Sequence, residues 1–303
     1  MGEARGKLLL FGEHSVVYGA PALGMPVSAG VRATLTEGTG QVHLSALPGG
    51  YAVPKQAPVG PEALVHRALG ELAASVDVTL ELGVPPMGGY GTSAAVALAV
   101  LRARAAWEGV EAPSPLESWR AAMAVETLAH ARPSGADPAI ICWERPIYFE
   151  RAASEDAAPR VEPLELRRTW WVLHGCCGSH GGTKASVGGL GRLREAQPTL
   201  FSAAVETLAE AAKTGRAALA SGDGAGLGPA LDLAHGVLSG LGRVAASVEA
   251  EVRAARAAGA VGAKMSGAGG HGGAWLAFFE DEASARAAAA QLDSALGVER
   301  LGD

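Results

Sequence analysis

Residues 83–93 read Gly-Val-Pro-Pro-Met-Gly-Gly-Tyr-Gly-Thr-Ser, a glycine-rich loop that ends in two hydroxyl side chains. Residues 76–82, just before it, alternate apolar and polar and predict a half-buried strand. The small apolar residues that follow, at 94–107, predict a helix. Glycines between a strand and a helix let backbone N–H groups converge on an anion, and the helix N-terminus adds its positive end. The loop therefore predicts a phosphate cradle, with a tight turn that serves only packing as the alternative.

A second glycine-rich stretch reads Lys-Met-Ser-Gly-Ala-Gly-Gly-His-Gly-Gly at 264–273, directly before an apolar segment at 274–279. That apolar segment predicts a strand. A flexible linker is the alternative, but linkers rarely adjoin so apolar a strand. Two such loops in one chain indicate a ligand rich in phosphate, held between them.

The rest of the chain predicts an α+β protein, because strands and helices are mixed without strict alternation. A capping box, Ser114 with Glu117, and Pro115 at the first helical position mark one helix start. We place a domain boundary before Arg168, giving domains 1–167 and 168–303. Further strands are expected at 8–11, 15–18, 27–35 and 168–173, and helices at 61–72, 115–130, 198–220, 229–240, 244–258 and 283–296.

Phosphoryl transfer also needs a group that accepts or orients the attacking hydroxyl, a metal and a cation. Asp137 lies in Arg-Pro-Ser-Gly-Ala-Asp-Pro at 132–138, where a rigid turn would aim its carboxylate. Glu126 lies in an apolar part of its helix and is a candidate metal ligand. Lys7 precedes an apolar strand. The alternatives are a turn residue for Asp137 and exposed surface positions for Glu126 and Lys7.

The composition limits the class of protein. The chain has 303 residues and a formal net charge of -6, which argues against a general nucleic-acid binder. The start of the chain lacks a secretory signal, and the apolar run at 94–101 is far shorter than a membrane-spanning helix. The odd count of cysteines, Cys142, Cys176 and Cys177, predicts free thiols. We therefore expect a cytoplasmic protein without a membrane segment.

Several segments together resemble the GHMP kinases, the family of galacto-, homoserine, mevalonate and phosphomevalonate kinases. The similarity is carried by residues 7–23, which begin Lys-Leu-Leu-Leu-Phe-Gly-Glu-His, by Gly-Tyr-Gly-Thr-Ser-Ala-Ala at 89–95, by His-Ala-Arg-Pro-Ser-Gly-Ala-Asp at 130–137 and by the loop at 264–273. Residues 181–184 and 233–242 add weaker matches. The resemblance implies a two-domain α+β fold with ATP and the acceptor in the cleft between the domains.

The resemblance also implies a reaction. Family members with the most similar motifs transfer the γ-phosphoryl group of ATP to the primary hydroxyl of mevalonate. Another small alcohol, such as phosphomevalonate or homoserine, is the alternative acceptor. A pseudoenzyme and an ATP-dependent decarboxylase are less well supported, because Lys7, Glu126 and Asp137 are all present and the first motif matches the kinases. The oligomeric state is open, with a homodimer as one alternative.

Roles follow position by position from the same resemblance. Asp137 matches the catalytic carboxylate, and Lys7 matches the lysine that contacts it. The match implies Mg²⁺ binding by Ser93 and Glu126 and places Glu13, His14 and Thr183 near the acceptor. The phosphates of ATP would contact Gly88, Gly89, Gly91, Thr92, Ser93, Ala94, Gly267, Gly269 and Gly270. The chain departs from the family pattern at Tyr90, Thr92, Ala131 and His271.

Overall fold

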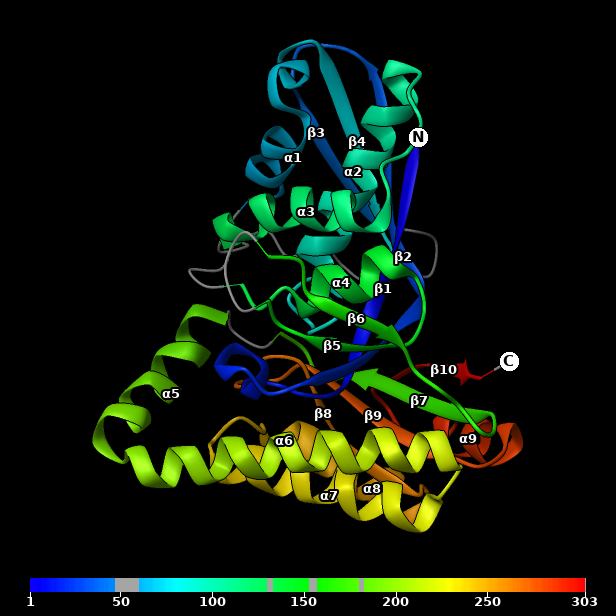
Figure 1. Ribbon diagram of the computed structural model, residues 1–303. Helices are drawn as coiled ribbons and strands as arrows, with labels where there is room; N and C mark the ends of the chain where they lie inside the picture. The colour runs from blue at the N-terminus through cyan, green and yellow to red at the C-terminus, as the bar shows by residue number, and fades with distance from the viewer. Residues whose placement is uncertain (47–59, 130–132, 153–156, 180–182, 303) are drawn as a thin grey trace. The chain divides into compact units, whose positions relative to one another are not determined.

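The computed structural model describes residues 1–46, 60–129, 133–152, 157–179 and 183–302. The chain forms two compact units (Figure 1). Unit 1 comprises Met1–Lys7 and Pro26–Arg145, and unit 2 comprises Leu8–Met25 and Pro146–Asp303. The boundary between residues 167 and 168 stays a prediction.

Unit 1 combines a sheet with a group of helices. Strand β4 pairs antiparallel with β2 and parallel with β3, so the strand order is β3-β4-β2, and β1 also pairs with β2. Helices α1 and α3 pack on α2. The elements are β1 (Gly2–Phe11), β2 (Ala22–Glu37), β3 (Val42–Ala46), α1 (Pro61–Leu69), η2 (Gly70–Ala74), β4 (Val76–Leu82), α2 (Thr92–Glu108), α3 (Pro115–Ala129) and α4 (Ala136–Trp143). Strands β1 and β2 extend into the segment of unit 2 at Leu8–Met25.

The core of unit 1 follows from the sequence pattern. In β4 the residues Val76, Val78, Leu80 and Leu82 are buried and alternate with more exposed ones, as period-two alternation requires. Helix α2 is buried along Ala94–Val100, where small side chains allow close packing. The predicted strand at 76–82 is confirmed, and the helix begins at Thr92, two residues earlier than predicted.

Unit 2 contains an antiparallel four-stranded sheet in the order β10-β7-β9-β8. Strands β5 and β6 form a second ladder, in which β5 also pairs with Ala22–Gly24 of β2. The elements are η1 (Ser15–Tyr18), β5 (Ile147–Glu150), β6 (Arg160–Pro163), β7 (Trp170–Cys176), α5 (Thr183–Ala196), α6 (Pro198–Ser221), α7 (Gly224–Gly240), α8 (Ala246–Ala257), β8 (Gly262–Ser266), β9 (Ala274–Phe279), α9 (Glu282–Ala289) and β10 (Ala295–Leu301).

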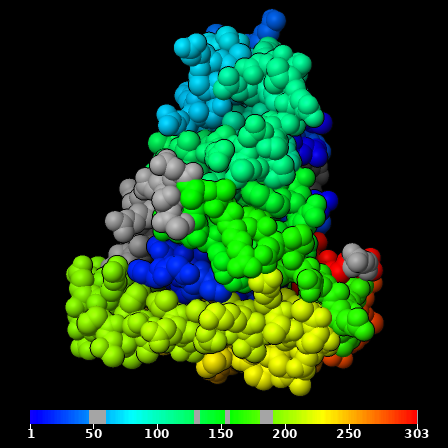
Figure 2. All heavy atoms as spheres, viewed as in Figure 1, coloured from blue at the N-terminus to red at the C-terminus, as the bar shows by residue number. Residues whose placement is uncertain are grey.

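Helices cover this sheet and bury β9, one of its two inner strands. All six residues of β9 are buried, and α7, α8 and α9 contact the sheet strands. Helix α6 packs on α7 and on η1, where the rings of Tyr18 and Phe201 meet edge to face with centroids 4.8 Å apart. In the space-filling view α6 forms part of the outer surface of unit 2 (Figure 2), and Leu200 at its start is 62% exposed.

Two predicted elements of unit 2 are wrong. Residues 15–18 form the 3₁₀-helix η1 and not a strand, because Gly12, with a φ of 102°, turns the chain and Val16 N–H then bonds back to Gly12 O at 3.1 Å. The helix predicted at 283–296 ends at Ala289. The chain then turns, and Ala295–Leu301 pairs with β7 as the edge strand β10. In the described part of the chain, no helix is both long and apolar enough to cross a membrane.

Candidate active site

A buried lysine and a carboxylate meet in unit 1. Lys7 in β1 has a side chain that is 1% exposed, and its Nζ lies 3.0 Å from Oδ1 of Asp137. The same Nζ donates a hydrogen bond of 2.8 Å to Gly89 O, and the backbone N–H of Lys7 donates to Tyr90 O at 3.0 Å. Lys7 therefore links the glycine-rich loop to the Asp137 carboxylate, and three residues predicted from the sequence come together.

Asp137 is placed by the start of a helix. It is the second residue of α4. The sequence predicts a rigid turn at this position, whereas the structure has the start of a helix. Gly135 is the N-cap, with a φ of 83°, and Ser134 Oγ accepts the N–H of Ala136 at 3.2 Å. The side chain of Asp137 is 32% exposed, so its carboxylate pairs with Lys7 and still reaches solvent. This arrangement suits a group that must also meet a substrate.

The glycine-rich loop ends at the N-terminus of α2. Gly91 is its N-cap with a φ of 67°, and a Cβ there would lie 3.0 Å from Cε and Cγ of Lys7. The Thr92 hydroxyl donates a hydrogen bond of 3.1 Å to Pro85 O. This hydrogen bond holds the loop in place. Ser93 is half-buried, and its hydroxyl makes no hydrogen bond to the described residues. The backbone N–H groups of this first turn make it suitable for an anion.

Glu126 is a buried carboxylate of α3, with a residue exposure of 2%. The described residues contain no cluster of three or more His, Cys, Asp or Glu side chains that would hold a metal alone. A carboxylate and a hydroxyl such as Ser93 are oxygen donors of the kind Mg²⁺ prefers, and phosphates commonly complete such sites. The residues present therefore fit a metal that arrives with a nucleotide.

The second glycine-rich loop, in unit 2, needs its glycines for backbone reasons. Gly267, Gly269 and Gly270 have φ values of 88°, 59° and 113°. A Cβ on Gly269 would lie 2.1 Å from the carbonyl oxygen of Arg243, and Gly270 N–H donates to that same oxygen at 2.7 Å. The loop is thus fixed against the turn after α7, which a flexible linker would not be.

Two residues predicted near the acceptor, Glu13 and His14, contact elements of unit 2. The carboxylate of Glu13 is fully buried against the ammonium of Lys264. His14 is half-buried and has a φ of 59°, and its Nε2 lies 2.9 Å from Ala268 O. Burial lowers the pKa of His14 to about 4, and the charge of Arg243 lowers it further, against the hydrogen bond to Ala268. His14 is therefore a neutral imidazole near pH 7.

The sequence also singled out Thr183, His271 and the three cysteines. Thr183 begins α5, but its side chain lies outside the described part of the chain, as do residues 130–132 of the third matching segment and residues 181–182. His271, which departs from the family pattern, is exposed. Cys142, Cys176 and Cys177 are thiols and form no disulfide with the described residues, and burial raises the pKa of Cys142 to about 12 and that of Cys176 to about 11.

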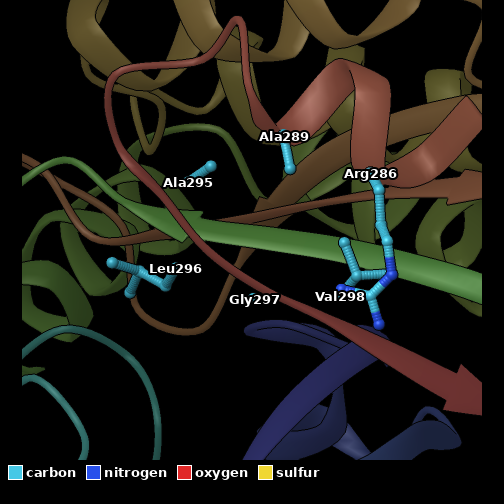
Figure 3. Close-up of a pocket in the computed structure, with 6 residues that line it drawn as sticks. All are labelled: Arg286, Ala289, Ala295, Leu296, Gly297 and Val298. Atoms are coloured by element: carbon cyan, nitrogen blue, oxygen red, sulfur yellow. The ribbon is translucent and has the colours of Figure 1, made fainter.

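A pocket of about 250 Å³ lies between α9 and β10 of unit 2 (Figure 3). It is lined by Arg286, Ala289, Ala295, Leu296, Gly297 and Val298. The Arg286 guanidinium is already paired with Glu282, and the pocket is smaller than typical ligand sites of about 300–1,000 Å³. None of the functional residues predicted from the sequence lines this pocket, so we assign the pocket no function.

Trp119 of α3 is a functional candidate that the sequence did not reveal. Its indole Nε1–H donates a buried hydrogen bond of 2.9 Å to Gly135 O, two residues before Asp137. A Cβ on Gly135 would lie 2.8 Å from Cζ2 of the same indole. Trp119 thus holds the residue that starts α4. Nothing in a sequence pattern predicts which carbonyl an indole will reach.

We expect Trp119→Phe to lower kcat about tenfold, as expected for one buried hydrogen bond, because the start of α4 and the Asp137 carboxylate would shift. KM for ATP should change less than twofold. The control is Trp107→Phe, since Trp107 is 41% exposed at the end of α2. Steady-state kinetics and thermal melting of both variants test this. Equal kcat in the two variants would refute the role.

Comparison with known families identifies the class of protein. The model of the GHMP kinase N-terminal domain matches residues 62–145, and that of the GHMP kinase C-terminal domain matches residues 198–298. The chain belongs to the GHMP kinase family. The first match contains the glycine-rich loop, Glu126 and Asp137, and the second contains the loop at 264–273.

Within that family, two relatives that are about 30% identical to the chain in sequence are mevalonate kinases. The chain is 31% identical to the mevalonate kinase of Aeropyrum pernix over 300 residues, which covers 92% of this chain and 88% of that protein. It is 30% identical to the mevalonate kinase of Pyrococcus horikoshii over 299 residues, covering 90% and 86%. A crystal structure of L. major mevalonate kinase in complex with R-mevalonate has the same fold, with a TM-score of 0.82, 24% identity, and coverage of 99% of this chain and 94% of that one.

Proposed function

We propose that this chain transfers the γ-phosphoryl group of ATP to the primary hydroxyl of mevalonate. The observation that carries the proposal is the pairing of the buried Lys7 ammonium with both the Asp137 carboxylate and a carbonyl of the glycine-rich loop. The kinase class also rests on the family, and the choice of mevalonate rests on relatives that are about 30% identical over nine-tenths of the chain.

Asp137 and Lys7 perform the proton and charge steps. The partly exposed Asp137 carboxylate accepts the proton of the attacking hydroxyl or orients that hydroxyl toward phosphorus. The Lys7 ammonium holds this carboxylate in one position, and it offsets negative charge that develops during transfer. The Lys7 side chain is buried, and its ammonium is held in one position by two acceptors inside unit 1, the Asp137 carboxylate and Gly89 O.

The phosphates are held by backbone groups. The first turn of α2, from Thr92 to Ala94, offers N–H groups and the positive end of the helix to them. Ser93 and Glu126 would hold Mg²⁺, which when bound neutralises phosphate charge. In unit 2, the resemblance to the GHMP kinases also assigns phosphate contacts to Gly267, Gly269 and Gly270, whose positive φ values shape that loop. Free thiols favour a reducing cytoplasm as the location.

An acceptor screen tests the proposed function. Purified protein with ATP and Mg²⁺ is given mevalonate, phosphomevalonate, homoserine or galactose, and ADP release is measured. We expect release with mevalonate well above the rate without an acceptor. ADP release with phosphomevalonate alone would support a kinase of this family, but it would show that the acceptor is phosphomevalonate and not mevalonate. Absence of acceptor-dependent release with all four compounds would refute the proposed function.

The metal assignment gives a separate prediction. Glu126→Gln removes a buried charge while keeping the shape of the side chain. We expect kcat to fall by about tenfold or more, and the Mg²⁺ concentration for half-maximal rate to rise, because one charged ligand is lost. The measurement is a Mg²⁺ titration at saturating ATP. Glu117→Gln is the control, since Glu117 lies in the same helix and serves its N-cap. An unchanged titration curve for Glu126→Gln would exclude Glu126 as a ligand.

A further inference from the structure

A fully buried ion pair lies outside the Lys7 and Asp137 machinery. Lys264 is the third residue of strand β8, and its ammonium pairs with the Glu13 carboxylate; both side chains have an exposure of 0%. Lys264 also donates to Met265 O at 2.7 Å. Buried ion pairs often add little net stability, because desolvation offsets their attraction. Stability alone is therefore a weak reason for this pair to exist.

The pair anchors a strained turn. Ser15 N–H donates to Glu13 O at 2.6 Å around His14, whose φ and ψ are 59° and -41°. This is the geometry of the rare γ-turn with positive φ, which persists only where surrounding contacts enforce it. The side chain of Glu13 is tied to β8 on one side of His14. On the other side Val17 N–H bonds to His14 O at 3.3 Å.

The strained turn fixes the direction of the His14 ring. Nε2 lies 2.9 Å from Ala268 O, so Nε2 carries the hydrogen and donates it. Nδ1 is then left with a lone pair that can accept a hydrogen bond from a hydroxyl. The ring is neutral near pH 7, because burial lowers the pKa of His14 to about 4. Glu13, in contrast, pairs with Lys264 through Oε1, and its side chain has an exposure of 0%, so it has no exposed surface to offer a substrate; its Oε2 is buried without a hydrogen bond to the described residues.

We propose that Lys264 is a positioning residue for the acceptor alcohol: through Glu13 it holds the γ-turn that presents Nδ1 of His14 to a hydroxyl of the acceptor. This inference rests on the proposed function and on the resemblance to the GHMP kinases, which places His14 near the acceptor. It gives Glu13 a supporting role in place of direct contact with the acceptor. It also gives a function to a lysine that the phosphoryl-transfer step does not use.

The test removes both charges together, so that no unpaired charge stays buried. In the variant Glu13→Gln/Lys264→Met we expect KM for mevalonate to rise about tenfold, the loss typical of one hydrogen bond. KM for ATP should change less than twofold, because Gly270 and Ser266 keep their bonds to Arg243 O and Leu9 O. The matched control is Glu210→Gln/Lys213→Met, an exposed pair of the same residue types on α6, which should leave both constants unchanged.

A His14→Ala background shows whether the Glu13–Lys264 pair positions His14 or supports the whole loop. If the pair acts through His14, adding the double substitution to His14→Ala should raise KM for mevalonate less than twofold further. Independent effects that multiply would overturn the proposal. So would equal increases in the two KM values, which would mean that Lys264 supports the whole loop.

A measurement without turnover completes the test. ¹⁵N-histidine spectra of the wild-type protein at pH 7 should show His14 as the neutral tautomer protonated at Nε2, and mevalonate should shift its Nδ1 resonance. This result holds whether or not a variant folds, and it is independent of phosphoryl transfer. An Nδ1 resonance that mevalonate leaves unchanged would overturn the inference, whereas the absence of ADP release by the wild-type protein would overturn the proposed function.

Discussion

Asp137→Asn is expected to lower kcat with mevalonate by about 10²-fold or more, because it removes the proton acceptor while keeping the size of the side chain. Asparagine also carries no charge to attract the Lys7 ammonium, which lies 3.0 Å from the native carboxylate. ATP binding should survive, since backbone groups of the glycine-rich loops hold the phosphates. The measurements are kcat and the dissociation constant for ATP on one purified preparation.

Asp232→Asn is the matched control for this variant. Asp232 is also paired with a cation, Arg256 at 2.8 Å, but belongs to unit 2 and has no role in the proposed reaction. It should retain near wild-type kcat. Near wild-type turnover by Asp137→Asn would show that Asp137 only begins α4, and the mechanism would be wrong.

Lys7→Met should have the second large effect, a loss in kcat of about 10²-fold, the size measured when one charge-stabilising donor is removed from an active site. Methionine replaces the buried stem of Lys7 but leaves Asp137 without its cation and Gly89 O without its donor. The lost bond to Gly89 should also lower the unfolding free energy by about 1–3 kcal/mol.

The kinetic and stability effects of Lys7→Met are separated by a control. Lys213→Met removes an exposed lysine that pairs with Glu210 on α6. It should change neither kcat nor melting temperature appreciably. If Lys7→Met lowered the melting temperature but kept kcat, Lys7 would be a structural residue and the charge-stabilising role would fail.

Elements set by nearby residues were predicted well from the sequence. The capping box is one case, because Ser114 N–H donates to Glu117 Oε2 at 2.9 Å and both partners lie within one helical turn. The strand at Val76–Leu82 is another, since its alternation encodes one buried face. Such contacts depend on spacing, which the sequence displays directly.

Elements set by distant residues were not predictable in this way. Residues 15–18 look like a strand because Val16, Val17 and Tyr18 favour strands. The turn that begins at Gly12, and in which Glu13 is held by Lys264, makes them a 3₁₀-helix instead. The helix predicted at 283–296 overlaps the first two residues of strand β10, and only the ladder of β10 with β7 defines that strand. These contacts join segments far apart in the chain.

The candidate site shows the same division. The glycine-rich loops were predicted to be phosphate cradles from their residues alone, and that role stays a prediction. The meeting of Lys7 with Asp137 followed from the family resemblance and not from any spacing, because the two belong to separate elements, β1 and α4. Trp119 and Lys264 were missed, since their partners are a carbonyl and a buried carboxylate that only the folded chain brings to them.

The central claim is that a phosphoryl group reaches the primary hydroxyl of mevalonate. The most direct measurement is the proton-coupled ³¹P NMR spectrum of a completed reaction with ATP, Mg²⁺ and mevalonate. We predict ADP together with a new phosphate monoester whose signal is a triplet, split by the two protons of the adjacent CH₂ group. A monoester signal without that splitting, or inorganic phosphate as the only product besides ADP, would contradict the account.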